Sequence, residues 1–119
     1  MRVLVVDDNV DAADSIALLL NIDGFEAHSV HGAMAALDAV VSIKPDVVLL
    51  DIGLPVMDGY EVAQRLRSRI PVEQMRIVAL SGYGQQTDRE RAARAGFDDY
   101  LVKPVEPTKL SEFLRSLLQ

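Results

Sequence analysis

The stretch DVVLLDIGLPVMDGYE, residues 46–61, decides how the rest of the chain is interpreted. Its four apolar residues, Val47 to Leu50, lead directly into an acid, Asp51, and a turn rich in Gly and Pro follows. A short, continuous apolar run bounded by turn residues is typical of a strand that is buried on both faces of a parallel sheet. Such a strand, ending on a carboxylate, places a charged group at the rim of the sheet, where ligands of parallel sheets bind.

Similar runs recur along the chain and alternate with segments of helical period. Strands are expected at 3–6, 25–30, 46–50, 76–80 and 99–102. The run 25–30 alternates and suits an edge strand, and the helix expected at 86–95 offers mainly alanines to a core. The last helix carries the apolar stripe Leu110, Phe113, Leu114, Leu117 and Leu118. Because each strand is followed by a helix, we predict an α/β fold of the (βα)5 type, with a doubly wound, five-stranded parallel sheet.

Composition limits the functions that the chain can have. Its 119 residues fit one domain, 1–119, and leave no room for an output domain. It has no apolar stretch of about 20 residues, so we expect no membrane span. The absence of cysteine excludes disulfides and thiolate metal sites and fits a cytoplasmic location. The net charge of −6 disfavours direct nucleic-acid binding, which needs a basic surface.

Polar residues stand directly after four of the expected strands. Asp7 and Asp8 follow the first strand, Asp51 the third, Ser81 the fourth and Lys103 the fifth. The carboxyl ends of parallel strands meet at one rim, where crowded carboxylates repel each other unless a proton or cation binds. Oxygen ligands favour Mg²⁺, and Lys and Ser are suited to phosphoryl oxygens. The set therefore predicts phosphoryl transfer to a carboxylate, with Asp51 as the best nucleophile.

The motifs that carry these residues are VLVVDDN, DVVLLDIGLPVMDGYE, IVALSGYG and GFDDYLVKPVEP. In this order and spacing they resemble the receiver domain of bacterial two-component response regulators, over essentially the whole chain. The resemblance implies a flavodoxin-like sheet of strand order 2-1-3-4-5. The phrases DNVDAADS, DIGLPVMDGYE and ALSGYGQ look most like the C-terminal receivers of hybrid sensor histidine kinases.

The resemblance also implies a role for each residue of the acidic site. Asp51 would accept a phosphoryl group from a sensor histidine kinase or a histidine phosphotransfer domain. Asp7, Asp8 and Asp51 would contribute carboxylates to a Mg²⁺ site, and Gly53 would contribute its backbone carbonyl. The chain would then phosphorylate and dephosphorylate itself without acting as an enzyme on other substrates.

The remaining implied roles concern signalling. Ser81 and Lys103 would bind phosphoryl oxygens, and Tyr100 stands where the family has its rotating aromatic residue. The Lys103–Pro104 bond would be cis. Movement of Ser81 would let Tyr100 turn inward, and an unknown target would recognise the face formed by 86–95, 99–102 and the last helix. The chain would be a monomer or a weak, phosphorylation-dependent dimer, and Tyr83 would shield the site from water.

Other functions remain as alternatives. One is the receiver of a hybrid histidine kinase that acts as a relay or phosphate sink, and another is a binding module that needs no phosphorylation. A phosphatase of the haloacid dehalogenase type needs a second acid two residues after the nucleophile, where this chain has Gly53. A flavodoxin-like cofactor binder needs a phosphate-binding loop after the first strand, where this chain has DDNVDAADS.

Several polar residues have simpler, structural interpretations. We expect Asp58 to cap the helix that follows it, and Asp8 and Asn9 offer the same role for the first helix. We expect Asp98 and Asp99 to be solvated turn residues. Surface positions are expected for His28, His31, Arg65, Arg67 and Arg69.

Overall fold

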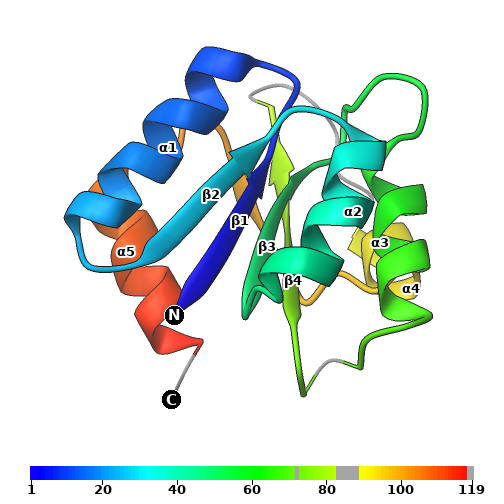
Figure 1. Cartoon of the computed structure of the whole chain (residues 1–119). Helices are drawn as coiled ribbons and strands as arrows, with labels where there is room; N and C mark the ends of the chain where they lie inside the picture. Colours follow the sequence, from blue (N-terminus) through cyan, green and yellow to red (C-terminus); the bar gives the residue numbers. More distant parts are fainter. Residues whose placement is uncertain (72, 83–88, 118–119) are drawn as a thin grey trace.

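The computed structural model describes residues 1–71, 73–82 and 89–117, and in these residues five strands alternate with five helices (Figure 1). The elements are β1 (Arg2–Val6), α1 (Val10–Ile22), β2 (Glu26–Val30), α2 (Ala33–Ile43), β3 (Val47–Asp51), α3 (Gly59–Arg67), β4 (Arg76–Ser81), α4 (Arg89–Ala95), β5 (Asp99–Val102) and α5 (Pro107–Ser116). The predicted alternation of strands and helices is confirmed. In the described part of the chain, no helix is long and apolar enough to span a bilayer.

All neighbouring strands of the sheet are parallel, and their order is β2-β1-β3-β4-β5. This confirms the predicted doubly wound fold and the edge position of β2. Two strands extend one residue further than predicted, because Asp51 pairs with Leu80 and Ser81 pairs with Val102. The two polar residues are therefore the last residues of β3 and β4, held by strand pairing rather than by loops.

Helices cover both faces of the sheet. Figure 1 shows α1 and α5 on one face and α2, α3 and α4 on the other. Alternate residues of β1 enter the two cores: Val3 and Val5 pack with α1 and α5, whereas Leu4 and Val6 pack with α2 and α3. The two cores explain why the central strands are apolar throughout rather than alternating.

The helix ends follow the expected chemistry. Asn9 and Asp58 each accept a backbone N–H in the first turn of their helices, at 3.1 and 3.0 Å. The apolar stripe on α5 packs in the core, with Leu110 and Leu114 buried and Phe113 and Leu117 partly buried, and Leu118 lies outside the described residues. Helix α4 contributes only small side chains to the core, Ala92 and Ala95. The predicted segment 86–95 is thus helical from Arg89 onward, and 83–88 lie outside the described residues.

Asp98 is an exposed residue, as predicted, but the expectation that the side chains of Arg67 and Asp98 are solvated is wrong. Their side chains are each 19% exposed, and Arg67 Nη2 lies 2.8 Å from Asp98 Oδ2. Arg67 also donates to the carbonyls of Gly96 and Met75, and Asp98 accepts the Ile77 N–H at 2.8 Å. The end of α3 and the α4–β5 turn converge on the start of β4, so these charges satisfy buried backbone groups. Arg65, Arg69 and Asp99 are exposed, as predicted.

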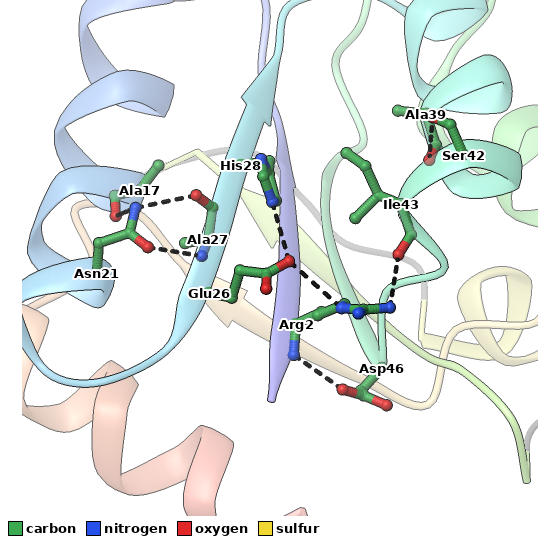
Figure 2. A network of polar contacts seen from close by, with 10 residues as sticks. All are labelled: Arg2, Ala17, Asn21, Glu26, Ala27, His28, Ala39, Ser42, Ile43 and Asp46. Atoms are coloured by element: carbon green, nitrogen blue, oxygen red, sulfur yellow. Dashed lines mark hydrogen bonds and ion pairs between the residues drawn. The ribbon is translucent and has the colours of Figure 1, made fainter.

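A polar network joins the starts of the first three strands in space (Figure 2). The backbone N–H of Arg2 donates to Asp46 at 2.8 Å, and its guanidinium lies 3.3 Å from Glu26. Glu26 also contacts His28, which is 44% exposed and thus a surface residue, as predicted. His31 is likewise exposed, at 38%, beside Asp14. This rim is therefore occupied by structural contacts, and the acids of the predicted site stand at the opposite rim.

Candidate functional site

The predicted site residues converge at the carboxyl ends of the strands. Asp7 directly follows β1, Asp51 ends β3, Ser81 ends β4 and Lys103 directly follows β5. Because β1, β3, β4 and β5 are adjacent and parallel, these four positions meet at one rim of the sheet. Strand order thus assembles residues that are separated by as many as 96 positions in the sequence.

Three carboxylates form the centre of the site. Asp7, Asp8 and Asp51 each offer an oxygen atom, and these atoms lie within 4.8 Å of one another. Asp7 and Asp51 are buried, with 1% and 6% of their surface exposed, whereas Asp8 is exposed. Two carboxylates of the cluster are therefore shielded from solvent, and the third is open to it.

Each buried carboxylate is oriented by one backbone N–H and by Lys103. Asp7 accepts the Asn9 N–H at 3.0 Å and the Lys103 ammonium at 2.7 Å. Asp51 accepts the Gly53 N–H at 2.9 Å, and its other oxygen lies 3.4 Å from Lys103 Nζ. One cation thus faces three anions, so the cluster keeps an excess of negative charge.

This excess is reflected in the titration of the site. Burial raises the pKa of Asp51 above its ordinary value, and Asp7 adds to the increase, against the Gly53 N–H and Lys103, which lower it. Burial alone would lower the pKa of Lys103, but its hydrogen bond to Asp7 and the charges of Asp51 and Asp7 raise it. The ammonium of Lys103 therefore stays charged. Burial and the neighbouring Asp7 disfavour the charged form of Asp51, and a second cation bound at the cluster would stabilise that form.

The donor set fits a metal ion. All side-chain donors of the cluster are carboxylate oxygens, which hard divalent cations prefer. The Gly53 N–H bond to Asp51 folds the backbone of residues 51–53 back over the acid, next to the cluster. The acidic cluster is thus able to hold a metal ion at the rim, beside Lys103.

The two predicted switch residues lie on β4 and β5, the two strands that follow β3 in the sheet. Ser81 is 1% exposed, and its carbonyl accepts the Lys103 N–H at 2.7 Å, which ties the end of β4 to the residue after β5. Tyr100 is half-buried in β5 and packs against the core on the α2–α3–α4 side. The Lys103–Pro104 bond is cis, as predicted. Tyr83, predicted to shield the site, lies outside the described residues.

Sequence reasoning missed the role of Gly59. A Cβ atom at this position would lie 2.5 Å from Ile52 Cα and 2.6 Å from the Asp51 carbonyl oxygen. Its N–H donates to the Ile52 carbonyl at 3.2 Å. The start of α3 therefore rests directly on the backbone of Asp51. The sequence signal for this contact is the Asp-Gly pair at 58–59, but these residue types alone predict only a turn and a cap.

Comparison with known proteins identifies the family. The family model of the response regulator receiver domain matches residues 3–115. The chain therefore belongs to the response regulator receiver domain family. This receiver is 35% identical to the response regulator MprA of Mycobacterium avium over 100% of its own length and 51% of that protein. It thus spans about half the length of MprA.

Two further likenesses agree with this family. An uncharacterized 14.6 kDa protein of Leptolyngbya boryana is 36% identical, over 92% of the receiver and 84% of that protein. The CheY-like response regulator receiver domain protein of Methanospirillum hungatei superposes with a TM-score of 0.87 at 29% identity, over 98% and 92% of the two chains. The family and two-component signalling are thereby established. The expected special likeness to receivers of hybrid kinases is not supported, because MprA is a response regulator.

Proposed function

We propose that this receiver is the phosphoacceptor of a two-component phosphorelay, and that Asp51 takes a phosphoryl group from a phosphohistidine. The donor is a sensor histidine kinase or a histidine phosphotransfer domain. The observation that carries the proposal is the position of Asp51, which ends the central strand β3, is 6% exposed and lies 3.4 Å from Lys103 within the acidic cluster. No other acid among the described residues combines these features.

The chemistry follows from the groups around Asp51. A carboxylate oxygen attacks phosphorus, the P–N bond to the donor imidazole breaks, and the imidazole leaves with that electron pair, giving an aspartyl phosphate. The Gly53 N–H holds one Asp51 oxygen, and Lys103 supplies positive charge for the phosphoryl oxygens. Mg²⁺ held by Asp7, Asp8, Asp51 and the Gly53 carbonyl would neutralise further charge on the transferring group.

A groove beside the site gives the donor access. It has a volume of about 470 Å³ and runs between α1 and α5, with Asp7 and Lys103 at one end and an apolar floor that includes Ile16, Leu19 and Leu110. An apolar helical surface of the donor, seated here, would bring its phosphohistidine to the acidic cluster. Turnover of other phosphate esters is not expected, because the general acid of haloacid dehalogenase-type phosphatases is replaced by Gly53.

Signal output uses Ser81 and Tyr100. Ser81 moves toward the phosphoryl group, Tyr100 turns inward, and the face of α4, β5 and α5 changes for a downstream target. Two features support this route: the Lys103 N–H bond to the Ser81 carbonyl couples β4 to the lysine, and Val102 leaves an apolar side chain 50% exposed on β5. Amide NMR shifts upon phosphorylation should extend to α4 and β5. Shifts confined to the surroundings of Asp51 would refute this route.

Acetyl phosphate with Mg²⁺ tests the central step. The intact protein should gain one phosphoryl group by mass spectrometry. Asp51→Asn should gain none, whereas Asp38→Asn, at an exposed position on α2, should be labelled like the original protein. Labelling of Asp51→Asn, or continuous release of phosphate over many turnovers, would overturn the proposal.

A further inference from the structure

Helix α4 is attached to its surroundings unequally at its two ends. Its C-terminal end is held by Arg67, whose guanidinium donates to the Gly96 carbonyl at 3.0 and 3.2 Å and pairs with Asp98. These groups are largely buried, and Asp98 is bonded in turn to β4. Along its length α4 buries only alanines. The helix therefore has a firm anchor at its C-terminal end and weak packing before it.

A second arginine joins the middle of α4 to the start of α3. The guanidinium carbon of Arg91 lies 4.0 Å from the centre of the Tyr60 ring, and its Nη2 lies 3.5 Å from Asp58 Oδ2. The rings of Tyr60 and Phe97 are perpendicular to each other, and their centres are 6.0 Å apart. The Arg91 and Asp58 side chains are 54% and 45% exposed, so this contact is far more open to water than the Arg67 anchor.

The start of α3 is in close contact with the backbone of Asp51. Gly59, between Asp58 and Tyr60, bonds to the Ile52 carbonyl and packs on the Asp51 backbone. Arg91 thus ties α4 to residues that are in backbone contact with the proposed phosphoacceptor. A contact at this place would weaken if α4 shifted relative to α3, and such a difference between two states is what a conformational equilibrium requires of a controlling interaction.

We propose that Arg91 is a positioning residue: with Asp58 and Tyr60 it forms a latch that holds α4 in its unphosphorylated position. The proposal rests on the proposed function, because the latch opposes the shift that the phosphoryl group drives. When the latch opens, α4 moves about the Arg67 anchor. An exposed cation–π contact contributes about 0.5–1 kcal/mol, which phosphorylation can overcome.

Removal of the latch should favour the phosphorylated conformation. Beryllofluoride with Mg²⁺ serves as the probe of that state, and its affinity is measured by titration calorimetry. Arg91→Ala should bind it about two- to fivefold more tightly than the original protein, since the lost contact no longer opposes the shift. Without the probe, the amide shifts of Ala92 and Ala95 in this variant should move part of the way toward their positions in the bound state.

Two variants separate the latch from a general effect of charge. Arg94→Ala removes the same charge from the same helix. Among the contacts of the described residues, Arg94 has only an ion pair with Glu90, at 3.8 Å, and its side chain is 70% exposed. The Arg94→Ala variant should therefore bind beryllofluoride like the original protein. Asp58→Asn removes the opposite charge and keeps the oxygen that caps α3 through Glu61. It should tighten binding in the same direction as Arg91→Ala but by less, because the Arg91–Tyr60 contact remains, and the double variant should bind no more tightly than Arg91→Ala alone.

The outcomes are distinct. Binding by Arg91→Ala that equals or is weaker than that of Arg94→Ala overturns the latch, as do opposite effects of Arg91→Ala and Asp58→Asn. Failure of the original protein to bind beryllofluoride overturns the proposed function itself. Thermal unfolding of each variant checks that it is folded, which the exposure of the substituted side chains predicts.

Discussion

The ammonium nitrogen of Lys103 lies 2.7 Å from Oδ2 of Asp7, although the two residues are 96 positions apart. The lysine would therefore compete with a metal ion in the acidic cluster for this carboxylate. Removing one unit charge about 5 Å from a divalent ion is worth about 1.7 kcal/mol even in a water-like dielectric. Lys103→Met should thus bind Mg²⁺ roughly tenfold more tightly, as measured by calorimetry.

The same variant should be phosphorylated by acetyl phosphate about a hundredfold more slowly, because a donor to the transferring group is lost. Tighter metal binding combined with slower phosphorylation distinguishes this role from simple damage to the site. Lys109→Met, which removes an exposed lysine on α5, is the matched control and should change neither quantity. Equal Mg²⁺ affinity of the two lysine variants would contradict the competition.

Substitution of Asp51 by Asn should stabilise the protein near neutral pH in the absence of Mg²⁺. Burial raises the pKa of Asp51, so the folded state binds its proton more tightly than the unfolded state does. This tighter proton binding stabilises the folded state at pH values below the ordinary pKa of an aspartate. The stabilisation is lost as the pH rises from that value through the raised pKa of Asp51. Urea unfolding should show the advantage of Asp51→Asn at pH 7 and a smaller advantage in acid.

Mg²⁺ should reverse part of this difference. At ten times its dissociation constant it should stabilise the original protein by about 1.4 kcal/mol, and Asp51→Asn by less. Asp38→Asn, at an exposed position on α2, controls for the change in net charge. If Asp51→Asn were the less stable protein at pH 7 without Mg²⁺, the electrostatic account of the cluster would be wrong.

The amino-acid sequence is sufficient to predict the fold and most of the site. Unbroken apolar runs identify central parallel strands, and the residue after each run marks the rim, so Asp7, Asp51, Ser81 and Lys103 can be grouped from their positions in the chain alone. The metal-binding capacity of the acidic residues follows from the same grouping. These predictions depend on the local pattern of apolar residues and on one topological rule, that the carboxyl ends of parallel strands meet at one rim. Both can be applied to a single sequence.

The sequence does not predict contacts between segments that no topological rule brings together. Arg67 and Asp98 looked solvated because charges on a helix and in a turn usually are, yet they meet across 31 positions to satisfy buried backbone groups. The close approach of Gly59 to Asp51 depends on the angle at which α3 leaves the loop. Neither periodicity nor composition encodes that angle.

Gly59→Ala should damage both the fold and the site. Its Cβ would lie 2.5 Å from Ile52 Cα and 2.6 Å from the Asp51 carbonyl oxygen, and these backbone atoms belong to the central strand and the loop that leaves it. Overpacking of this kind costs about 1–3 kcal/mol. Relief of the clash displaces Asp51, so acetyl phosphate labelling should be slower even in the folded fraction.

Gly32→Ala is the matched control for this substitution. No atom lies within 4 Å of a Cβ at Gly32, which caps α2 with an extended backbone, so the change should cost less than about 1 kcal/mol. Labelling of Asp51 should be unaffected. If the two alanine variants unfolded at the same urea concentration and were labelled equally fast, the start of α3 would not be in close contact with the acceptor in solution.

Arg67→Ala should be among the most destabilising changes of a charged residue. It would leave the carbonyls of Gly96 and Met75 without this donor and would remove the cationic partner of Asp98, which keeps only the Ile77 N–H. Loss of such a partner costs several kcal/mol when fully buried, and we expect about 2–3 kcal/mol at this partly exposed site. Arg65→Ala, on the same helix, removes only an exposed pair with Glu61 at 3.9 Å and should cost about 0.5 kcal/mol or less. Urea unfolding of the two variants measures this difference in stability. Equal urea midpoints for Arg67→Ala and Arg65→Ala would mean that the Arg67 side chain is solvated.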